Sequence, residues 1–371
     1  MTKTRWWDDP KEIINVPKSD KRNAYLDWVK GITIIFVVWG HVIQYFSYDS
    51  LNFFDNPVFK FLYSFHMPLF MLVSGYLYFY SLGKRTAVQA ILQRMKELGI
   101  AIFTWGTLQY ILIAANNIHK GSFSFSIRDY VSQLLGIWFL WSVLAASVIV
   151  ALIEKVIPVK WLRNLLLLTG FPILFFLPNS ALNLYMYPFF VIGFKFNEYR
   201  KVIPEKAEKL KYLSFIIFPC LLFFFQERDY IYTSGINPFS SEYGILTQIG
   251  IDVYRWGIGL AGSVFILSII QIVYENQKKK DRLSTRDFKI IASIGQFSLQ
   301  IYMIQTFVLE RISTEIFRMA VDKLGYNPLT FNVILFDLIA FLIAFVFTIT
   351  IWIISKGIKK IPRMHKVFFG R

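Results

Sequence analysis

Long apolar runs separated by short charged clusters constrain this chain more than any other feature of its sequence. A helix needs about 20 apolar residues to cross a hydrocarbon core of about 30 Å, and runs near that length recur along the chain, in which 55% of the residues are apolar. In lipid every backbone group has to be hydrogen-bonded internally, so such runs form helices. The sequence predicts an all-α polytopic transmembrane bundle of about ten helices. The ten runs are 31–46, 58–80, 98–115, 134–154, 164–178, 180–196, 212–226, 256–274, 290–310 and 329–355.

Lysine and arginine residues gather in alternate gaps between these runs. With the N-terminus in the cytoplasm, about four-fifths of the 40 cations fall on the cytoplasmic side, which predicts that both termini are cytoplasmic. The net charge of +16 is spread over these gaps and does not indicate nucleic-acid binding. We expect a multi-pass protein of the cell membrane, most simply the bacterial cytoplasmic membrane. Its parts are a cytoplasmic N-terminal segment (1–30), a transmembrane domain (31–355) and a cytoplasmic basic tail (356–371).

The first run carries a polar stripe. In KGITIIFVVWGH, Lys30 and His41 lie eleven residues apart, close to three helical turns, so they share nearly one face. Asp27 falls near the same stripe. A rise of about 1.5 Å per residue places His41 roughly 16 Å beyond Lys30, about halfway across the membrane. Such a stripe is expected to face the bundle interior or a wet cavity.

The second run contains FHMPLFMLVSGYLY (65–78) and brings in a second histidine from the opposite direction. His66 is expected roughly 13 Å from the outer end of its helix, at a height similar to that of His41. Ser74 supplies a small polar group two turns further in. Two simpler interpretations stay open: His66 as a hydrogen-bonding partner between helices, and Lys30 with Asp27 as an ordinary cytoplasmic anchor.

The residues around both histidines resemble a known family. RNAYLDWVKGITIIFVVWGH (22–41) is similar to the first-helix signature of the membrane acyltransferase 3 family, including its Lys/Arg, ten residues, His element. FHMPLFMLVSGYLY is similar to that family's second-helix motif, and weaker similarity follows at 136–144, 187–194 and 294–305. The lysine in DWVKG and the expected lack of a soluble domain most resemble the surface-polysaccharide O-acetyltransferase branch, which includes fucose 4-O-acetylase-like proteins.

This resemblance implies an enzyme that transfers an acyl group, usually acetyl from cytoplasmic acetyl-CoA, to a hydroxyl of an extracytoplasmic or lipid-linked glycan. His41 stands at the position of the family's essential histidine, and Lys30 at that of its conserved cation. The implied partners are the acyl-CoA donor, a surface polysaccharide or its lipid-linked precursor, and membrane lipid. No permanently bound cofactor, metal or nucleic acid is expected, and the oligomeric state stays open.

The chain departs from the family pattern at two places. Family members often carry two arginines three residues apart after the second helix, whereas here Arg94 is followed at that spacing by Glu97. The ninth-helix motif often ends in histidine, where this chain has Gln305. These departures concern contacts with the donor and the role of the ninth helix.

The residue types suit acyl transfer. A base has to remove the hydroxyl proton, and a neutral imidazole does so near neutral pH, although His41 could equally carry the acyl group as a nucleophile. The donor phosphates require cations at the cytoplasmic mouth. The predicted site comprises His41 as the catalytic residue, His66, Asp27 and Ser74 in support, and Lys30, Arg22, Arg85 and Arg94 for acyl-CoA.

Other polar residues have simpler interpretations. Asp252 and Arg255 are expected to form an i,i+3 pair, and Glu310 and Arg311 an interfacial pair at an outer helix end. Aromatic residues in the outer loop 227–247 suit a sugar face or, preferentially, the membrane interface.

Two functions without acyl transfer stay open. The main alternative is a glycan transporter or exporter, in which the two histidines serve proton coupling. A sensor or scaffold subunit is a third, and it would tolerate the loss of His41, whereas an acyltransferase would not.

Overall fold

Every regular element in the computed structural model is a helix, within the residues that it describes: 23–47, 52–119, 121, 125–169, 171–199, 204–237, 239, 242–280, 282–283, 285–325 and 332–370. The predicted all-α helix bundle is therefore confirmed. By length and composition, six continuous helices in the described part of the chain can cross a membrane. They are α2 (Ala24–Phe46), α3 (Pro57–Gly83), Ala87–His119, α7 (Trp138–Val156), α12 (Ile245–Lys279) and α16 (Val333–Lys359). The third comprises α4 (Ala87–Arg94), a π-helix (Met95–Gly99) and α5 (Ile100–His119).

Two more predicted runs form single helices, α9 (Ser180–Tyr199) and α10 (Pro204–Phe224). The run 164–178 does not, because α8 (Lys160–Thr169) gives way to a 3-10 segment, Phe171–Phe176. Pro172 has no amide hydrogen and cannot continue the preceding α-helix. Short elements between these helices include the 3-10 helices Phe53–Asp55 and Glu227–Asp229, α6 (Ile127–Gly136) and α11 (Ile231–Ser234).

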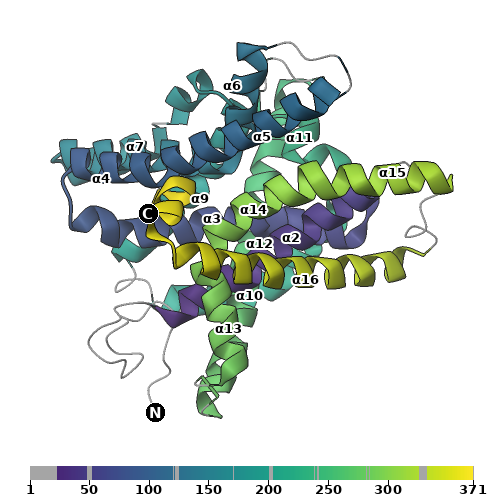
Figure 1. The fold of residues 1–371 in the computed structure, drawn as a ribbon. Coiled ribbons are helices and arrows are strands. Elements are labelled where there is room, and N and C mark those ends of the chain that lie inside the picture. Colours follow the sequence, from purple (N-terminus) through teal and green to yellow (C-terminus); the bar gives the residue numbers. More distant parts are fainter. Residues whose placement is uncertain are drawn as a thin grey trace.

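The predicted helix 290–310 is broken. α13 (Arg286–Gln296) ends at Phe297, and α14 (Ser298–Phe307) continues through a π-helix (Val308–Ser313) into α15 (Thr314–Leu324). Figure 1 shows α13 standing across α2 and α16, whereas α15 lies along them. Hydropathy does not reveal this break, because the apolar pattern resumes directly after the short polar sequence GQFS.

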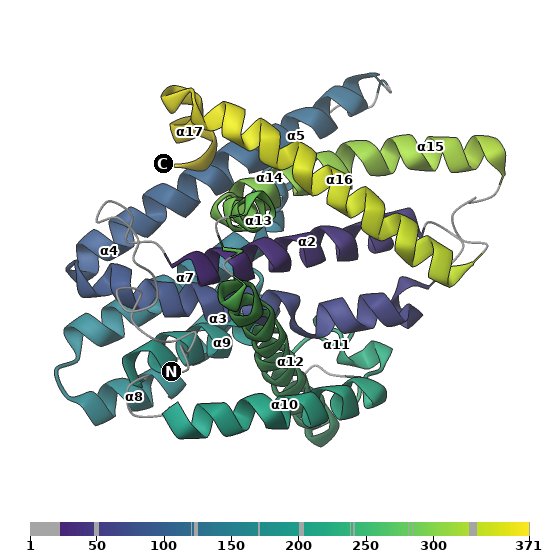
Figure 2. The ribbon, with the colours of Figure 1, turned by 90° about the horizontal axis from the view of Figure 1, so that it is seen from below.

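α2 and α3 are antiparallel neighbours at the centre of the bundle (Figure 2). Asn23 caps α2, its side chain accepting a hydrogen bond from the backbone of the first turn, so the helix begins at Ala24 rather than at residue 31. Asp27 and Lys30 therefore belong to the helix itself. α16 runs opposite to α2, so the start of α2 and the end of α16 lie on one side (Figure 2), which agrees with the predicted placement of both termini.

Two close crossings set the geometry around the candidate site. A Cβ added to Gly295 of α13 would lie 1.7 Å from the Asp27 carbonyl oxygen of α2. Where α3 meets α9, a Cβ on Gly75 or on Gly193 would lie 1.9 Å from the opposite backbone. Small residues allow helices in membranes to approach this closely. The crossings fix α13 against the first turns of α2, and α9 along the middle of α3.

The segment 356–371, predicted as a basic tail, contains the end of α16 and a further helix, α17 (Pro362–Phe369). Figure 2 shows α17 turning back from the end of α16 toward α5.

Candidate active site

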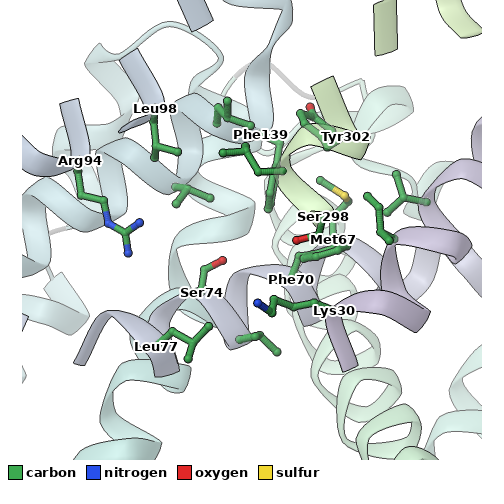
Figure 3. A pocket seen from close by; sticks show the side chains of 16 residues that line it. Lys30, Met67, Phe70, Ser74, Leu77, Arg94, Leu98, Phe139, Ser298 and Tyr302 are labelled. Atoms are coloured by element: carbon green, nitrogen blue, oxygen red, sulfur yellow. The ribbon is translucent and has the colours of Figure 1, made fainter. Parts of the chain in front are cut away.

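A cavity of about 130 Å³ lies among α2, α3, α7, α14 and the π-helix between α4 and α5. Figure 3 shows Lys30 and Arg94 reaching toward it from different sides, with Ser74 between them. Ser298 of α14 lines the same end. The opposite end is apolar and aromatic, and is lined by Val37, Met67, Phe139 and Tyr302. The cavity therefore passes from a cationic mouth, near the start of α2, to a less polar interior.

Both cations of this cavity have a carboxylate three residues away. Lys30 Nζ lies 2.7 Å from Asp27 Oδ1, and Arg94 Nη1 lies 3.6 Å from Glu97 Oε2. The Arg94 guanidinium also lies over the Tyr78 ring, 4.8 Å from its centroid. Asp27 is buried, so its pair with Lys30 is largely removed from water. An anion entering the cavity meets two cations whose charge is partly compensated.

His41 is oriented by a relay of hydrogen bonds on α14. Thr306 Oγ1 donates to the Tyr302 carbonyl oxygen at 2.9 Å, and Gln305 Nε2 donates to Thr306 Oγ1 at 2.9 Å. Gln305 therefore presents its Oε1 to His41 Nδ1, also at 2.9 Å. Because an amide oxygen only accepts, the proton of the neutral imidazole is assigned to Nδ1. The lone pair of His41 is then on Nε2.

His66 is held by its own helix. Its Nδ1 lies 2.6 Å from the Leu62 carbonyl oxygen, which accepts a hydrogen bond from it. The proton of this ring is therefore also assigned to Nδ1, and the lone pair to Nε2. The ring is buried and packs edge-on against Tyr63, with centroids 4.6 Å apart. His66 lies within electrostatic range of His41.

A second, smaller pocket of about 20 Å³ lies on the other side of Met67, whose side chain lines both cavities. We refer to the larger one as the inner cavity and to this one as the outer pocket. His66 lines the outer pocket together with the rings of Tyr63, Trp138, Tyr185, Tyr230 and Tyr232. Its volume suits one water molecule or one hydroxyl group.

A buried arginine fixes one wall of the outer pocket. Arg255 of α12 donates to the carbonyl oxygens of Asp229 (2.9 Å) and Gly235 (2.7 Å), and pairs with Asp252 at 2.9 Å. The predicted i,i+3 pair is confirmed, and it is buried. Burial raises the pKa of the Asp229 carboxyl above its ordinary value, as expected where water is excluded. These bonds hold the aromatic part of the outer loop against α12, so that its tyrosines line a pocket.

His41 lines neither cavity, but its neighbours on α2 adjoin both. Val37, one turn before it on α2, lines the inner cavity. Tyr63, which lines the outer pocket, packs on Gly40, where a Cβ would lie 2.8 Å from the tyrosine ring. Both cavities thus adjoin the turn of α2 that carries His41, and Met67 lines both of them.

Among the residues that the structure describes, those predicted to bind or support the donor do not line the inner cavity themselves, with the exception of Lys30, Arg94 and Ser74. Arg22 lies outside the described residues. Arg85 donates to the carbonyl and hydroxyl oxygens of Ser81, both at 3.0 Å, and lines a separate surface depression. Asp27 adjoins the inner cavity through its ion pair with Lys30. Of the predicted cations, the structure thus brings Lys30 and Arg94 together in one cavity.

Glu310 and Arg311 interact electrostatically, and each also contacts a residue of another helix. Both lie in the π-helix Val308–Ser313, where Glu310 hydrogen-bonds Tyr45 and Arg311 donates to Gln133 at 3.0 Å. Both side chains therefore bind residues of other helices. π-helices are rare and are frequently found at functional sites.

Sequence reasoning missed the contribution of α14. Gln305 enters the sequence-based prediction only as a departure from the family pattern. The available signal is an amide within an apolar run, which indicates a buried polar partner. Ser298 and Tyr302 carry no comparable signal, because the break at Phe297 decides which face of α14 meets α2.

Comparison with known proteins gives one family. The model of the family described as "Acyltransferase domain" matches residues 23–355. The chain is 34% identical over 208 residues to the nodulation protein NolL of Sinorhizobium fredii, covering 54% of this chain and 56% of that protein. It is 30% identical over 183 residues to the nodulation protein NolL of Mesorhizobium japonicum, covering 48% of each. The chain thus spans about half the length of the curated relatives it matches. No solved structure matches it.

Proposed function

The chain belongs to the acyltransferase-domain family, and on this basis we propose that it is an integral-membrane O-acyltransferase. It moves an acyl group, most simply acetyl, from a cytoplasmic acyl-CoA to a hydroxyl of an extracytoplasmic or lipid-linked glycan. One observation carries this proposal: the hydrogen bond from His41 Nδ1 to Gln305 leaves the imidazole lone pair on Nε2, on a turn of α2 that adjoins both a cavity with two cations and a pocket of aromatic rings.

In this reaction His41 acts on the acceptor hydroxyl. Nε2 accepts the hydroxyl proton while the oxygen attacks the thioester carbonyl, the carbon–sulfur bond breaks, and the proton passes to the leaving thiolate. Gln305 Oε1 accepts a hydrogen bond from Nδ1 and stabilises the imidazolium formed on the way. In a second route, Nε2 first takes the acyl group and then passes it to the hydroxyl. Both routes use the same lone pair.

The inner cavity is the proposed donor site. The phosphates of the acyl-CoA stay at its mouth, where Lys30 and Arg94 offer charge-assisted hydrogen bonds. The pantetheine arm extends past Ser74 along the apolar lining, which brings the thioester toward Met67. His41 and Lys30 are separated by about three turns of α2 because the thioester and the phosphates lie at opposite ends of the donor.

Replacing Lys30 or Arg94 by alanine is expected to weaken acetyl-CoA binding by about tenfold each, because each change removes one charge-assisted hydrogen bond. Binding by the wild-type protein should also weaken as salt concentration rises. Isothermal titration calorimetry on the purified protein measures this without an acceptor. Lys155→Ala is the matched control, an exposed cation in the last turn of α7. If the Lys30→Ala, Arg94→Ala double variant binds acetyl-CoA as wild type does, the donor site is elsewhere.

The outer pocket is the proposed entry for the acceptor hydroxyl. It has room for a hydroxyl group and not for a whole sugar ring, so the ring would rest outside it, against Tyr232, which is exposed. His66 and Met67 line the pocket and border the route to His41. Aromatic side chains offer a large apolar face with a polar edge, which suits a ring bearing hydroxyl groups.

Tyr232→Ala is expected to raise the apparent KM for the glycan acceptor by roughly 2- to 10-fold, since one aromatic contact is lost. Acetyl-CoA binding should stay unchanged, because Tyr232 lies on the far side of Met67 from the donor cavity. The assay follows labelled acetyl transferred to increasing amounts of lipid-linked glycan extracted from the host membrane. Phe239→Ala, an exposed aromatic change in the same outer loop, is the control. Equal acceptor KM values for the two variants would contradict this assignment.

The activity itself is tested in inverted membrane vesicles that contain the wild-type protein, labelled acetyl-CoA outside and glycan acceptor. Label in alkali-labile ester linkage to the glycan is the expected result. Movement of glycan across the membrane without any label would favour the transporter alternative.

A further inference from the structure

The helix α17 lies beyond the residues that the family model matches, which end at residue 355. Its sequence, PRMHKVFFG, predicts only a basic segment near the membrane surface. In the structure it packs on α5, the helix that follows the π-helix of the inner cavity (Figure 2). Around this packing site, α17 and the residue that follows it contact two walls of the cavity mouth: the π-helix Met95–Gly99 and α14.

The last turn of α17 is bonded to α5. Trp105 Nε1 donates to the Phe368 carbonyl oxygen at 3.0 Å, and Thr104 Oγ1 donates to that of Val367 at 2.8 Å. The Trp105 ring also contacts the rings of Phe368 and Phe369, with centroids 5.8 and 6.0 Å apart. Phe369 is completely buried. α5 thus satisfies carbonyl groups that the end of a helix otherwise leaves without partners.

Gly370 then brings the chain onto the π-helix Met95–Gly99. It adopts a left-handed conformation with φ of +67°, and a Cβ at this position would lie 2.3 Å from the Lys96 carbonyl oxygen and 2.8 Å from that of Glu97. Only glycine allows this approach without strain. Arg94, which reaches the inner cavity, directly precedes this π-helix.

The π-helix is itself part of the cavity wall. Leu98 lines the cavity, and Glu97 pairs with Arg94 and accepts a hydrogen bond from Gln93 at 2.7 Å. A displacement of the π-helix would therefore move both the guanidinium and its partner carboxylate.

α17 also reaches the opposite wall. His365 Nε2 lies 3.4 Å from Gln300 Nε2 of α14, the helix whose Ser298 and Tyr302 line the cavity. α17 thus contacts α14 on one side of the mouth, and Gly370, which directly follows α17, contacts the π-helix on the other.

We propose that α17 is a positioning element of the donor site, which holds the π-helix so that Arg94 faces Lys30 across the inner cavity. This proposal rests on the donor assignment made above and adds to it a segment outside the matched family region. Phe369 and Gly370 act through Arg94 and do not touch the donor.

The test compares acetyl-CoA binding and turnover in variants of these two residues. Phe369→Ala and Gly370→Ala are each expected to raise the dissociation constant of acetyl-CoA by about 3- to 10-fold, no more than Arg94→Ala does. Turnover at saturating acetyl-CoA should stay within about twofold of wild type, because the reacting groups are untouched. Phe369→Leu, which keeps apolar volume, should bind more tightly than Phe369→Ala, and Arg363→Ala, an exposed change on the same helix, should match wild type.

A second measurement separates positioning from general support. In the Arg94→Ala background, Phe369→Ala should weaken acetyl-CoA binding no further, since the group it positions is gone. Equal weakening in both backgrounds, or wild-type binding by both Phe369→Ala and Gly370→Ala, would overturn the proposal and leave the donor assignment standing. Failure of the wild-type protein to bind acetyl-CoA would overturn the donor assignment and this role together. Should Phe369→Ala not fold, Gly370→Ala and Phe369→Leu carry the same comparison.

Discussion

His41→Ala is expected to lower acyl transfer to the glycan by about 10²–10⁴-fold, the usual loss for a general base, while the protein stays folded and inserted. The variant removes the Nε2 lone pair that is proposed to take the hydroxyl proton. It also leaves Gln305 Oε1 without its partner, a cost too small to unfold a bundle whose centre is packed by α2 and α3. The measurement is the acetate released by mild alkali from surface glycans, in cells that express each variant at matched levels.

Variants of two other histidines serve as comparisons for His41→Ala. His66→Ala should be milder, about tenfold, because His66 lines the outer pocket and its Nδ1 is satisfied within its own helix. His119→Ala, an exposed change at the end of α5, should match wild type. Full acetylation in cells with His41→Ala would overturn the catalytic assignment. Loss of acetylation together with loss of the protein from the membrane would assign His41 a structural role instead.

The central part of the site could be predicted from the sequence because it depends on local geometry. The spacing of Lys30 and His41 on one helix, and the depth of His66 on the next, follow from helical rise alone. Apolar runs of sufficient length gave the six continuous spanning helices. Ser74 was predicted only as a small polar group two turns beyond His66, and the structure adds that it lines the same cavity as Lys30.

The features of the fold and the site that the sequence did not predict depend on contacts between distant segments. The break between α13 and α14 comes two residues after Gly295, where α13 crosses α2 closely, and hydropathy contains neither feature. The contacts that Glu310 and Arg311 make with Tyr45 and Gln133 accompany the predicted pair, and the sequence pattern does not contain them. Arg85 and Arg94 looked alike in sequence, and only the packing of α4 separates them. α17 was foreseen as a charged segment, since two adjacent phenylalanines do not by themselves specify the surface that buries them.

Gln305→Leu is expected to lower acyl transfer by about 10- to 100-fold, the range typical of losing the group that orients a functional histidine. Leucine fills a similar volume but cannot accept a hydrogen bond from Nδ1. The neutral imidazole then has no hydrogen bond that favours the tautomer protonated at Nδ1. Protonation of Nε2 instead would remove the lone pair that takes the hydroxyl proton. Thr306 retains its bond to the Tyr302 carbonyl oxygen, so the turn of α14 that carries Gln305 should stay intact.

Gln305→Glu is the matched variant, because its carboxylate still accepts from Nδ1, and it should retain more activity than Gln305→Leu. The deciding readout is ¹⁵N NMR of histidine-labelled protein, which reports which ring nitrogen carries the proton. His41→Ala identifies the signal among the four histidines of the chain. Wild type and Gln305→Glu should show His41 protonated at Nδ1, and Gln305→Leu should show a shift toward Nε2. If activity falls in Gln305→Leu while the His41 proton stays on Nδ1, Gln305 supports the site by packing and the orienting relay is wrong.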